Sequence, residues 1–372
     1  MTVVVAGALA NKPVNGGEAW VRLSYIRGLE RLGFGVFFVE QIDQAAATGR
    51  SLAYRDAVVA AFDLERSSAL VGSDGIVIRG EEERLLATVE SADLLLNVSG
   101  NLTCEPFFSR FRRRAYVDLD PGYTQIWSQA GLGVGRLSEH HVHFTVGTNV
   151  GTERSSVPSA GLMWLPTLPP VVLSDWPTAP APDPNRFTTV ASWRGAYGRV
   201  EHNGVLYGQK AHEFRRFVDL PGRVSAVVEV ALAVDEADAP DVAALQQRGW
   251  VVVDPRTVAG DPSRFRDYVQ QSGAEFSVAQ GIYVETNSGW FSDRTTRYLA
   301  SGKPALVQDT GLSGTLPLGD GLLAFRTLDD AVAGAEAIAA DYERHAHRAR
   351  AIAEAFFDSD RVLIKLLEDA LG

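Results

Sequence analysis

Two carboxylates come directly after an apolar stretch, in the segment Asp118-Leu119-Asp120-Pro121-Gly122-Tyr123. If residues 115–118 form a strand, the alternation of side chains places Asp118 and Asp120 on one side of its end. A carboxylate in such a position can accept a proton from a hydroxyl group as a general base. The alternative is an Asx turn that caps the loop. We favour the first interpretation and select Asp120 as a candidate catalytic residue.

Two cations follow another apolar stretch, residues 187–192. Arg194 comes directly after this stretch, and Lys210 begins a helical run. Two cations at one strand end can neutralise a diphosphate leaving group, whereas the alternative is a pair of solvated surface charges. The residues between them, 195–208, contain Asn203-Gly204 and predict a hairpin insertion.

The glycines Gly16 and Gly17 precede a run of apolar residues at helical spacing, which ends near Gly33. The N–H groups at the start of such a helix favour an anion or a closely approaching sugar, and Glu18 adds a carboxylate there. A flexible turn with a glutamate that complements the helix dipole is the alternative.

Residues 289–311 form the most specific stretch of the chain. Ser292, Arg294 and Thr295 stand where a loop enters a predicted helix, whose N-terminus can meet a phosphate group. Gly302 is expected to end that helix, and Thr310-Gly311 follow the next strand, so they are expected to return to the same ligand. Packing is the alternative interpretation of this stretch.

Three histidines lie in the segment Glu139-His140-His141-Val142-His143. His141 and His143 share one face if this segment is a strand. No suitably spaced acid or cysteine completes a zinc signature, so we expect no metal site and expect one of these histidines to line a cleft.

Strand and helix patterns alternate along the whole chain, which predicts an α/β fold with two parallel sheets. Seven prolines between Leu165 and Pro184 exclude a continuous helix or central strand there. The predicted organisation is an N-terminal Rossmann-like domain (1–172), a proline-rich linker (173–185), a C-terminal Rossmann-like domain (186–355) that ends in a long helix from Asp329, and a terminal helix (356–372).

The chain of 372 residues has a net charge of -11, so we expect no nucleic-acid partner and no binding to anionic lipid. No segment is apolar enough for a membrane span. The single cysteine, Cys104, permits no intramolecular disulfide and suits a reducing cytoplasm. The oligomeric state does not follow from the sequence.

Taken together, these residues resemble the GT-B glycosyltransferases, in particular the retaining, sugar-nucleotide-dependent branch of glycosyltransferase family 4. Ala300-Ser301-Gly302-Lys303-Pro304 and Thr310-Gly311 are similar to the end of its characteristic helix and the strand end that follows. Gly16-Gly17 resembles its first glycine-rich loop, and Arg194 with Lys210 its phosphate-binding pair.

The resemblance implies two Rossmann-like domains that face each other across a cleft. It also implies a nucleotide-diphosphate sugar held by the C-terminal domain, a small-molecule or glycan acceptor held by the N-terminal domain, and hexosyl transfer without a metal or a further cofactor. In an inverting enzyme Asp120 or His140 would then deprotonate the acceptor hydroxyl, whereas in a retaining enzyme the leaving phosphate itself would do so. The terminal helix is expected to return to the N-terminal domain.

The chain departs from that branch at one place. The branch has two glutamates eight positions apart, and this sequence has Gly289 and Arg297 there, with Glu285 as a nearby substitute. Two alternatives therefore stay open, a nucleotide-sugar 2-epimerase of the same fold and a nucleotide-sugar-binding accessory protein without activity.

Overall fold

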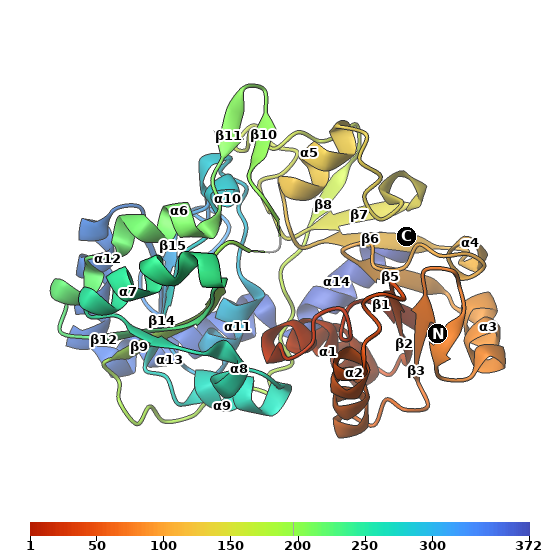
Figure 1. Ribbon diagram of the computed structural model, residues 1–372, viewed down its shortest axis with the longest axis horizontal. Helices are drawn as coiled ribbons and strands as arrows, with labels where there is room; N and C mark the ends of the chain where they lie inside the picture. The colour runs from red at the N-terminus through yellow and green to blue at the C-terminus, as the bar shows by residue number, and fades with distance from the viewer. Residues whose placement is uncertain (196) are drawn as a thin grey trace.

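The computed structural model describes residues 1–195 and 197–372 and contains two α/β domains side by side (Figure 1). The N-terminal domain is built on an eight-stranded sheet of order β4-β3-β2-β1-β5-β6-β7-β8, parallel except for the β3–β4 pair. Its strands are β1 (Thr2–Ala6), β2 (Gly35–Ile42), β3 (Ser68–Gly72), β4 (Val77–Arg79), β5 (Leu94–Val98), β6 (Arg114–Asp118), β7 (Val142–Thr145) and β8 (Trp164–Pro166). Its helices are α1 (Gly16–Arg31), α2 (Gly49–Ala61), α3 (Glu82–Ser91), α4 (Phe107–Arg110), α5 (Tyr123–Gln129) and the 3-10 turn at Leu137–Glu139.

The C-terminal domain is built on a parallel six-stranded sheet of order β13-β12-β9-β14-β15-β16. Its strands are β9 (Arg186–Ser192), β12 (Val227–Ala233), β13 (Val251–Val253), β14 (Ala274–Ser277), β15 (Ala305–Gln308) and β16 (Leu322–Phe325). Its helices are α6 (Lys210–Phe214), α7 (Ala239–Gln247), α8 (Pro255–Val258), α9 (Pro262–Gln270), α10 (Gly281–Glu285), α11 (Asp293–Ala300), α12 (Leu328–Ala340) and α13 (Tyr342–Ile352). The predicted α/β class and the two parallel sheets are thus confirmed.

The local signals in the sequence act as predicted at α1 and at the hairpin. The Asn15 side chain accepts a hydrogen bond from the Glu18 backbone N–H at 3.1 Å, which caps the start of α1, and Gly33 follows its end with φ of +84°. The hairpin pairs β10 (Val200–His202) with β11 (Val205–Tyr207) across the Asn203-Gly204 turn. It projects beyond the C-terminal domain above the boundary between the domains (Figure 1).

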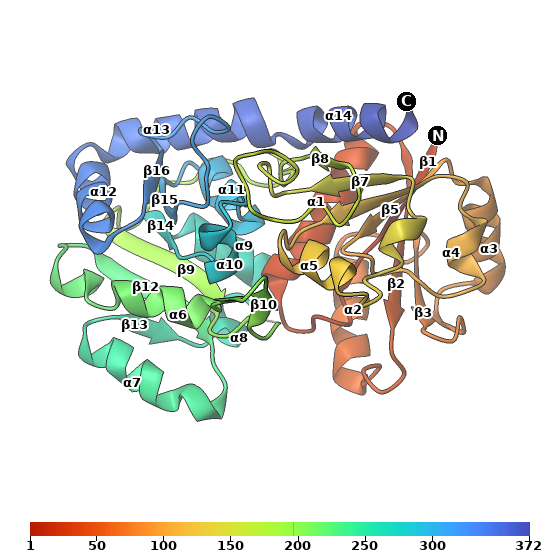
Figure 2. The same ribbon diagram turned by 90° about the horizontal axis from the view of Figure 1, so that it is seen from above.

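Two crossings of the chain join the domains, and they lie side by side. The Val171 N–H donates to the Phe357 carbonyl at 2.8 Å, and the Ser359 N–H donates to the Val171 carbonyl at 2.9 Å. After the second crossing, α14 (Ser359–Leu371) packs on α1, where a side chain at Gly28 would meet Leu363. Helices α13 and α14 lie in succession along one side of both domains (Figure 2).

The prediction of one continuous helix from Asp329 to about residue 355 is wrong. Helix α12 ends at Ala340, and α13 begins at Tyr342 and runs into a π-helical turn at Ala353–Phe357. Asp341 leaves the helical conformation, with φ of -147° and ψ of 62°. The break allows the Tyr342 hydroxyl to donate to the Gly273 carbonyl at 2.9 Å, a contact with the loop before β14. Among the described residues, no helix is long and apolar enough to cross a bilayer.

Candidate functional site

The cleft between the two domains contains two adjoining cavities of about 470 and 340 Å³. The larger cavity extends along the ends of β9 and β12 in the C-terminal domain. The smaller cavity extends along the ends of β5 and β6 in the N-terminal domain. Ligands of open parallel sheets bind at such strand ends. The side chains that line both cavities are Lys12, Glu18, Val21, Asp120, Tyr197, Lys210, Gln280, Asp293 and Arg294.

Lys210 and Arg294 both line this cleft. The sequence predicts Lys210 beside the end of a strand and Arg294 at the start of a helix, and their role in phosphate binding stays a prediction. The Arg294 guanidinium donates to Glu275 at 2.6 Å, to the Val190 carbonyl at 2.8 Å and to Ser277 Oγ at 2.6 Å. These bonds fix its orientation against the sheet. The Lys210 backbone is held by Gln280 Oε1 at 2.6 Å, whereas its ammonium group has no protein partner within the described residues.

The environment of Lys210 works against its positive charge. Burial, followed by the nearby Arg294 guanidinium, lowers the pKa of Lys210 to about 7. Glu275 and Asp293 offset part of this effect, and an anion that enters the cavity would stabilise the charged form of Lys210 further. The Lys210 ammonium is therefore suited to bind an anionic group of a ligand.

Arg194 does not join these two cations, which corrects the sequence-based expectation. Its guanidinium pairs with Asp238, with both N–O distances at 2.7 Å, and its side chain is 51% exposed. It lines neither cavity. Asp238 belongs to the segment after β12, and no pattern in the sequence reveals that this carboxylate lies beside Arg194. Lys12, which sequence reasoning missed, approaches both cavities from the N-terminal domain instead.

The glycines at the start of α1 mainly serve the contact between the domains. A side chain at Gly16 would place its Cβ 2.1 Å from the Asp261 carbonyl oxygen, and the Gly16 N–H donates to the Ala259 carbonyl at 2.9 Å. Gly17 faces the ring of Phe265, yet it also lines the larger cavity. The structure therefore contradicts a phosphate-binding role for the Gly16 N–H group, because that group already has a partner.

The residues at the start of α11 divide between the cleft and the interior. Ser292 lines the smaller cavity just before the helix begins. Thr295 is fully buried, and its hydroxyl lies outside both cleft cavities. The predicted helix N-terminus thus faces the cleft through Ser292, Asp293 and Arg294, while the structure does not bring Thr295 to it.

Thr310 and Gly311 connect loops and do not line either cleft cavity, contrary to expectation. The Thr310 hydroxyl donates to the Trp290 carbonyl at 2.6 Å, and the Gly311 carbonyl accepts from the Asn149 amide at 2.9 Å. A side chain at Gly311 would meet Asn287 at 2.5 Å. The residues that match the glycosyltransferase motif here therefore lie at the interface between the two domains.

Asp118 and Asp120 differ sharply although they are two residues apart. Asp118 is fully buried and accepts from the Thr124 and Thr145 hydroxyls at 2.7 Å and from the Gln125 amide at 2.8 Å. It also accepts from the Asp120 N–H at 3.0 Å. Asp118 is therefore a structural residue that fixes the turn on which Asp120 stands.

Asp120 lines both cavities. Among the described residues, two side chains donate hydrogen bonds to its carboxylate. The Tyr283 hydroxyl donates to Oδ1 at 2.8 Å, and the Tyr197 hydroxyl lies 3.5 Å from Oδ2. Burial, together with the charges of Asp118 and Glu18, raises the pKa of Asp120 to about 6 even though Tyr283 counteracts this effect. A carboxylate with such a pKa exchanges protons near neutral pH, as a general base must.

Glu18 lines both cavities as an ionised carboxylate. Burial opposes its charge, but Arg22, with which it forms an ion pair, and Lys12 outweigh burial and lower the pKa of Glu18. The sequence predicts Glu18 as a carboxylate at a helix start and as a further candidate catalytic residue. The structure places it near Asp120, and its catalytic role stays a prediction. Its acceptor oxygens are available to bind hydroxyl groups of a ligand.

His140 lies outside the cleft, which corrects its selection as a second candidate base. Its Nε2 contacts the Asn97 side chain at 3.1 Å, and its Nδ1 contacts the Arg136 carbonyl at 3.0 Å. Burial lowers its pKa to about 4, so it is neutral at physiological pH. His143 is likewise engaged by the Leu137 carbonyl at 2.9 Å. Glu285, the proposed substitute for the missing glutamates, also lines neither cleft cavity.

The end of β2 anchors the two loops that line the smaller cavity. The buried Glu40 carboxylate accepts from the backbone N–H groups of Leu9, Ala10 and Asn11, at 2.8 to 2.9 Å. The Gln41 side chain accepts from the N–H groups of Thr103 and Cys104 at 2.7 and 2.8 Å.

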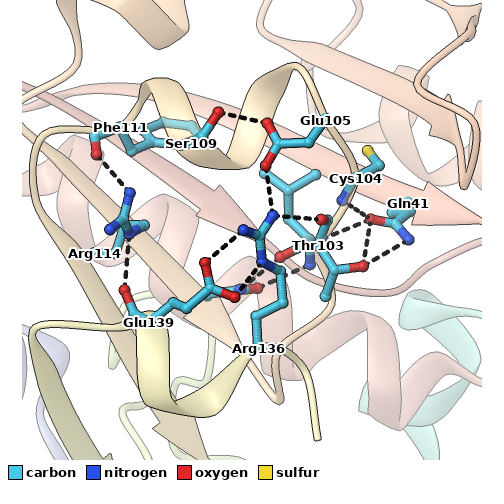
Figure 3. A network of polar contacts seen from close by, with 11 residues as sticks. Gln41, Thr103, Cys104, Glu105, Ser109, Phe111, Arg114, Arg136 and Glu139 are labelled. Carbon is cyan, nitrogen blue, oxygen red and sulfur yellow. Dashed lines mark hydrogen bonds and ion pairs between the residues drawn. The ribbon is translucent and has the colours of Figure 1, made fainter. Parts of the chain in front are cut away.

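Figure 3 shows how the second of these loops is fixed from its other side. The Arg136 guanidinium donates to the Thr103 carbonyl at 3.1 Å and to Glu105 at 2.6 Å, and it also pairs with Glu139. The loop carries Asn101, and Ser99 just before it has φ of +55°, an uncommon conformation for serine. Both line the smaller cavity, so this wall of polar groups is rigidly held.

Metal coordination has no obvious location. Across residues 1–195 and 197–372, no group of three or more His, Cys, Asp or Glu side chains is placed to hold a metal ion. The expectation of a metal-independent site stays a prediction.

No protein-family profile and no curated protein sequence matches this chain. Solved structures match it over its whole length. An α-glucosyltransferase in complex with UDP and a 13-mer DNA containing an HMU base has a TM-score of 0.66 at 11% identity, with 100% of each chain covered. An α-glucosyltransferase in complex with UDP-glucose and DNA containing an abasic site has a TM-score of 0.62 at 12% identity, with 100% of this chain and 99% of that chain covered. Alr3699/HepE from Anabaena, in complex with UDP-glucose, has a TM-score of 0.61 at 12% identity, with 99% of each chain covered.

These comparisons correct one expectation. The net charge predicts no nucleic-acid partner. That prediction is wrong, because neighbours with this architecture are in complex with DNA. A local surface, and not the charge of the whole chain, determines such contacts. The agreement in architecture extends over both domains. The chain therefore has the GT-B fold of these glycosyltransferases.

Proposed function

We propose that this protein transfers a hexosyl group from a nucleoside diphosphate sugar to a hydroxyl group of an acceptor, without a metal ion. The observation that carries the proposal is the meeting of Lys210 and Arg294 with Asp120 across one cleft. Cations from the C-terminal domain face a carboxylate of the N-terminal domain that has a pKa of about 6. Transfer from a diphosphate needs both kinds of group.

The larger cavity is the proposed site of the donor. Lys210 and Arg294 would bind the diphosphate, and Lys12 would approach it from the N-terminal domain. Charge develops on the diphosphate as it leaves, so cations already fixed around it stabilise the transition state. The neighbours in complex with UDP or UDP-glucose support a uridine nucleotide as the first donor to test.

The smaller cavity is the proposed site of the acceptor. In the proposed reaction an acceptor hydroxyl gives its proton to Asp120 while its oxygen forms a bond to the anomeric carbon. The bond between that carbon and the diphosphate oxygen breaks, and the nucleoside diphosphate leaves with the electron pair. Asn11, Ser99 and Asn101 supply polar groups that can orient the acceptor.

The proposal is tested by release of nucleoside diphosphate. The protein would be incubated with UDP-hexoses in the presence of sugars, small hydroxylated molecules or a DNA duplex that carries an HMU base. We expect release of UDP that depends on one class of acceptor and appears with a glycosylated product. Conversion of the donor to its C2 epimer without an acceptor would indicate the epimerase alternative. Donor binding without turnover on any acceptor would indicate an accessory protein. A cytoplasmic location stays a prediction.

A further inference from the structure

A hydrogen bond across the cleft joins the proposed base to the opposite domain. Asp120 follows β6 in the N-terminal domain, and Tyr283 lies on α10 in the C-terminal domain. The Tyr283 hydroxyl donates to Asp120 Oδ1 at 2.8 Å. The tyrosine ring is 3% exposed and stacks on Trp290, with ring centroids 4.6 Å apart at 27°. The donor is therefore held in place independently of Asp120.

The turn after Asp120 is shaped to let α10 approach. Gly122 has φ of +98°, and a Cβ there would lie 2.9 Å from the Ile282 side chain. Glycine is needed at this position both for the backbone conformation and for the close contact. The residue next to Tyr283 thus packs directly on the loop that carries Asp120.

We propose that Tyr283 is a positioning residue, whose hydroxyl fixes Asp120 Oδ1 and leaves Oδ2 to accept the proton of the acceptor hydroxyl. Within residues 1–195 and 197–372, the one hydrogen-bond partner of Oδ2 is the Tyr197 hydroxyl at 3.5 Å, which is the limit of a hydrogen bond and can be displaced by a substrate. The inference rests on the proposed function. It adds that the base is completed by a group from the donor-binding domain, so domain separation would leave Asp120 without its principal side-chain donor.

Removal of the Tyr283 hydroxyl should make the ionised form of Asp120 less favourable. A hydrogen bond to the charged form of a carboxyl group lowers its pKa, and Tyr283 is the strongest such contribution to Asp120. The other ionisable groups that face Asp120 from the surrounding elements are Lys12, Glu18, Tyr116, Asp118, Tyr123 and Tyr197. Tyr283→Phe leaves all of these, and the stacked ring, in place.

The first test is the pH profile of the transfer reaction. In Tyr283→Phe we expect the acidic limb of kcat/KM for the acceptor, near pH 6 in the wild type, to move upward by about one unit. KM for the donor should stay within about twofold, since the hydroxyl does not contact the diphosphate cations. Tyr197→Phe is the matched control, and its longer contact predicts a smaller displacement of the limb. A uniform loss of kcat/KM for the acceptor at all pH values, or equal displacement in both variants, overturns the proposal.

The second test needs no turnover. The free energy of unfolding of Asp120→Asn minus that of the wild type should increase from about pH 4 and level off near pH 6. In that range the Asp120 carboxyl ionises more readily in the unfolded chain than in the folded protein, whereas the asparagine does not ionise. In a Tyr283→Phe background the levelling should occur at a higher pH. If it does and no donor is ever turned over, the proposed function fails while the Tyr283 contact to Asp120 stands. If the levelling does not move, Tyr283 does not act through Asp120.

Discussion

The two walls of the cleft carry charges of opposite sign. On each wall, one charged side chain has its hydrogen bonds complete and a second one does not. On the C-terminal wall, Arg294 is fully engaged by Glu275, Ser277 and Val190, whereas the Lys210 ammonium lacks a protein partner among the described residues. On the N-terminal wall, Asp118 has its hydrogen bonds complete, whereas Asp120 has one good donor.

The residue of each pair with fewer hydrogen bonds, Lys210 or Asp120, has a pKa near neutral pH. The pKa of Lys210 is lowered to about 7, and that of Asp120 is raised to about 6, in both cases chiefly by burial. In each pair, we interpret the residue with complete hydrogen bonds, Arg294 or Asp118, as structural and the other residue as the functional one. Lys210 and Asp120 are the charges that a substrate would complete, by an anion and by a proton donor respectively.

The largest effect is expected on the N-terminal wall. Asp120→Asn removes the proton acceptor but keeps the shape of the side chain, so kcat should fall roughly 10²- to 10⁴-fold. Donor binding, measured by calorimetry, should stay within about twofold. A variant with near-normal kcat would show that Asp120 is not the base.

The matching test of the C-terminal wall is Lys210→Ala. Loss of a charge-assisted contact of about 1.5–3 kcal/mol should weaken UDP binding roughly 10- to 100-fold, with little change for uridine. Arg194→Ala is the control, because Arg194 pairs with Asp238 outside the cavities, and it should leave both affinities unchanged. Equal loss for UDP and uridine in Lys210→Ala would remove Lys210 from the phosphate site. Arg294→Ala is a poorer probe, since it leaves the buried Glu275 without its partner.

The pKa of Lys210 also predicts a pH dependence of donor binding. UDP-glucose carries no phosphate that titrates near neutral pH, so any change must come from the protein. Because the anion binds the charged lysine, affinity should fall roughly tenfold between pH 6 and pH 8 as the free protein loses this proton. Calorimetry in buffers of different ionisation enthalpy should show proton uptake on binding at pH 8. Lys210→Ala should abolish that uptake, and uptake that persists in this variant would assign it to another group.

The smallest effect, on the free energy of unfolding, is expected for substitutions of the glycines that begin two helices. Gly16 and Gly49 are the first residues of α1 and α2, but only Gly16 lies against another backbone, at Asp261. Gly16→Ala should lower the free energy of unfolding by about 1–3 kcal/mol, whereas Gly49→Ala, which has open space around it, should be neutral or slightly stabilising. Thermal unfolding of both variants measures the difference. Equal stability in the two variants would contradict the interdomain role of Gly16.

Much of the fold could be predicted because alternating patterns determine strands and helices locally. Strand order then brings the carboxyl ends of β6 and β9 to one cleft, which is lined by Asp120 after β6, by Lys210 at the start of α6 and by Arg294 at the start of α11. Arg194 and His140 could not be placed in this way. Their orientation depends on Asp238 and on Asn97, which are distant in the sequence and become neighbours only in the folded chain. Lys12 stands in the loop before Gly16 and Gly17, and its residue type alone does not distinguish it from a solvated surface lysine.

The most direct test of the account is a crystal structure of the protein with UDP. We expect a diphosphate oxygen to lie within about 3 Å of Lys210 Nζ and the diphosphate to lie beside Arg294 in the larger cavity. A nucleotide seated at Arg194, or a diphosphate that faces solvent away from Lys210, would contradict it.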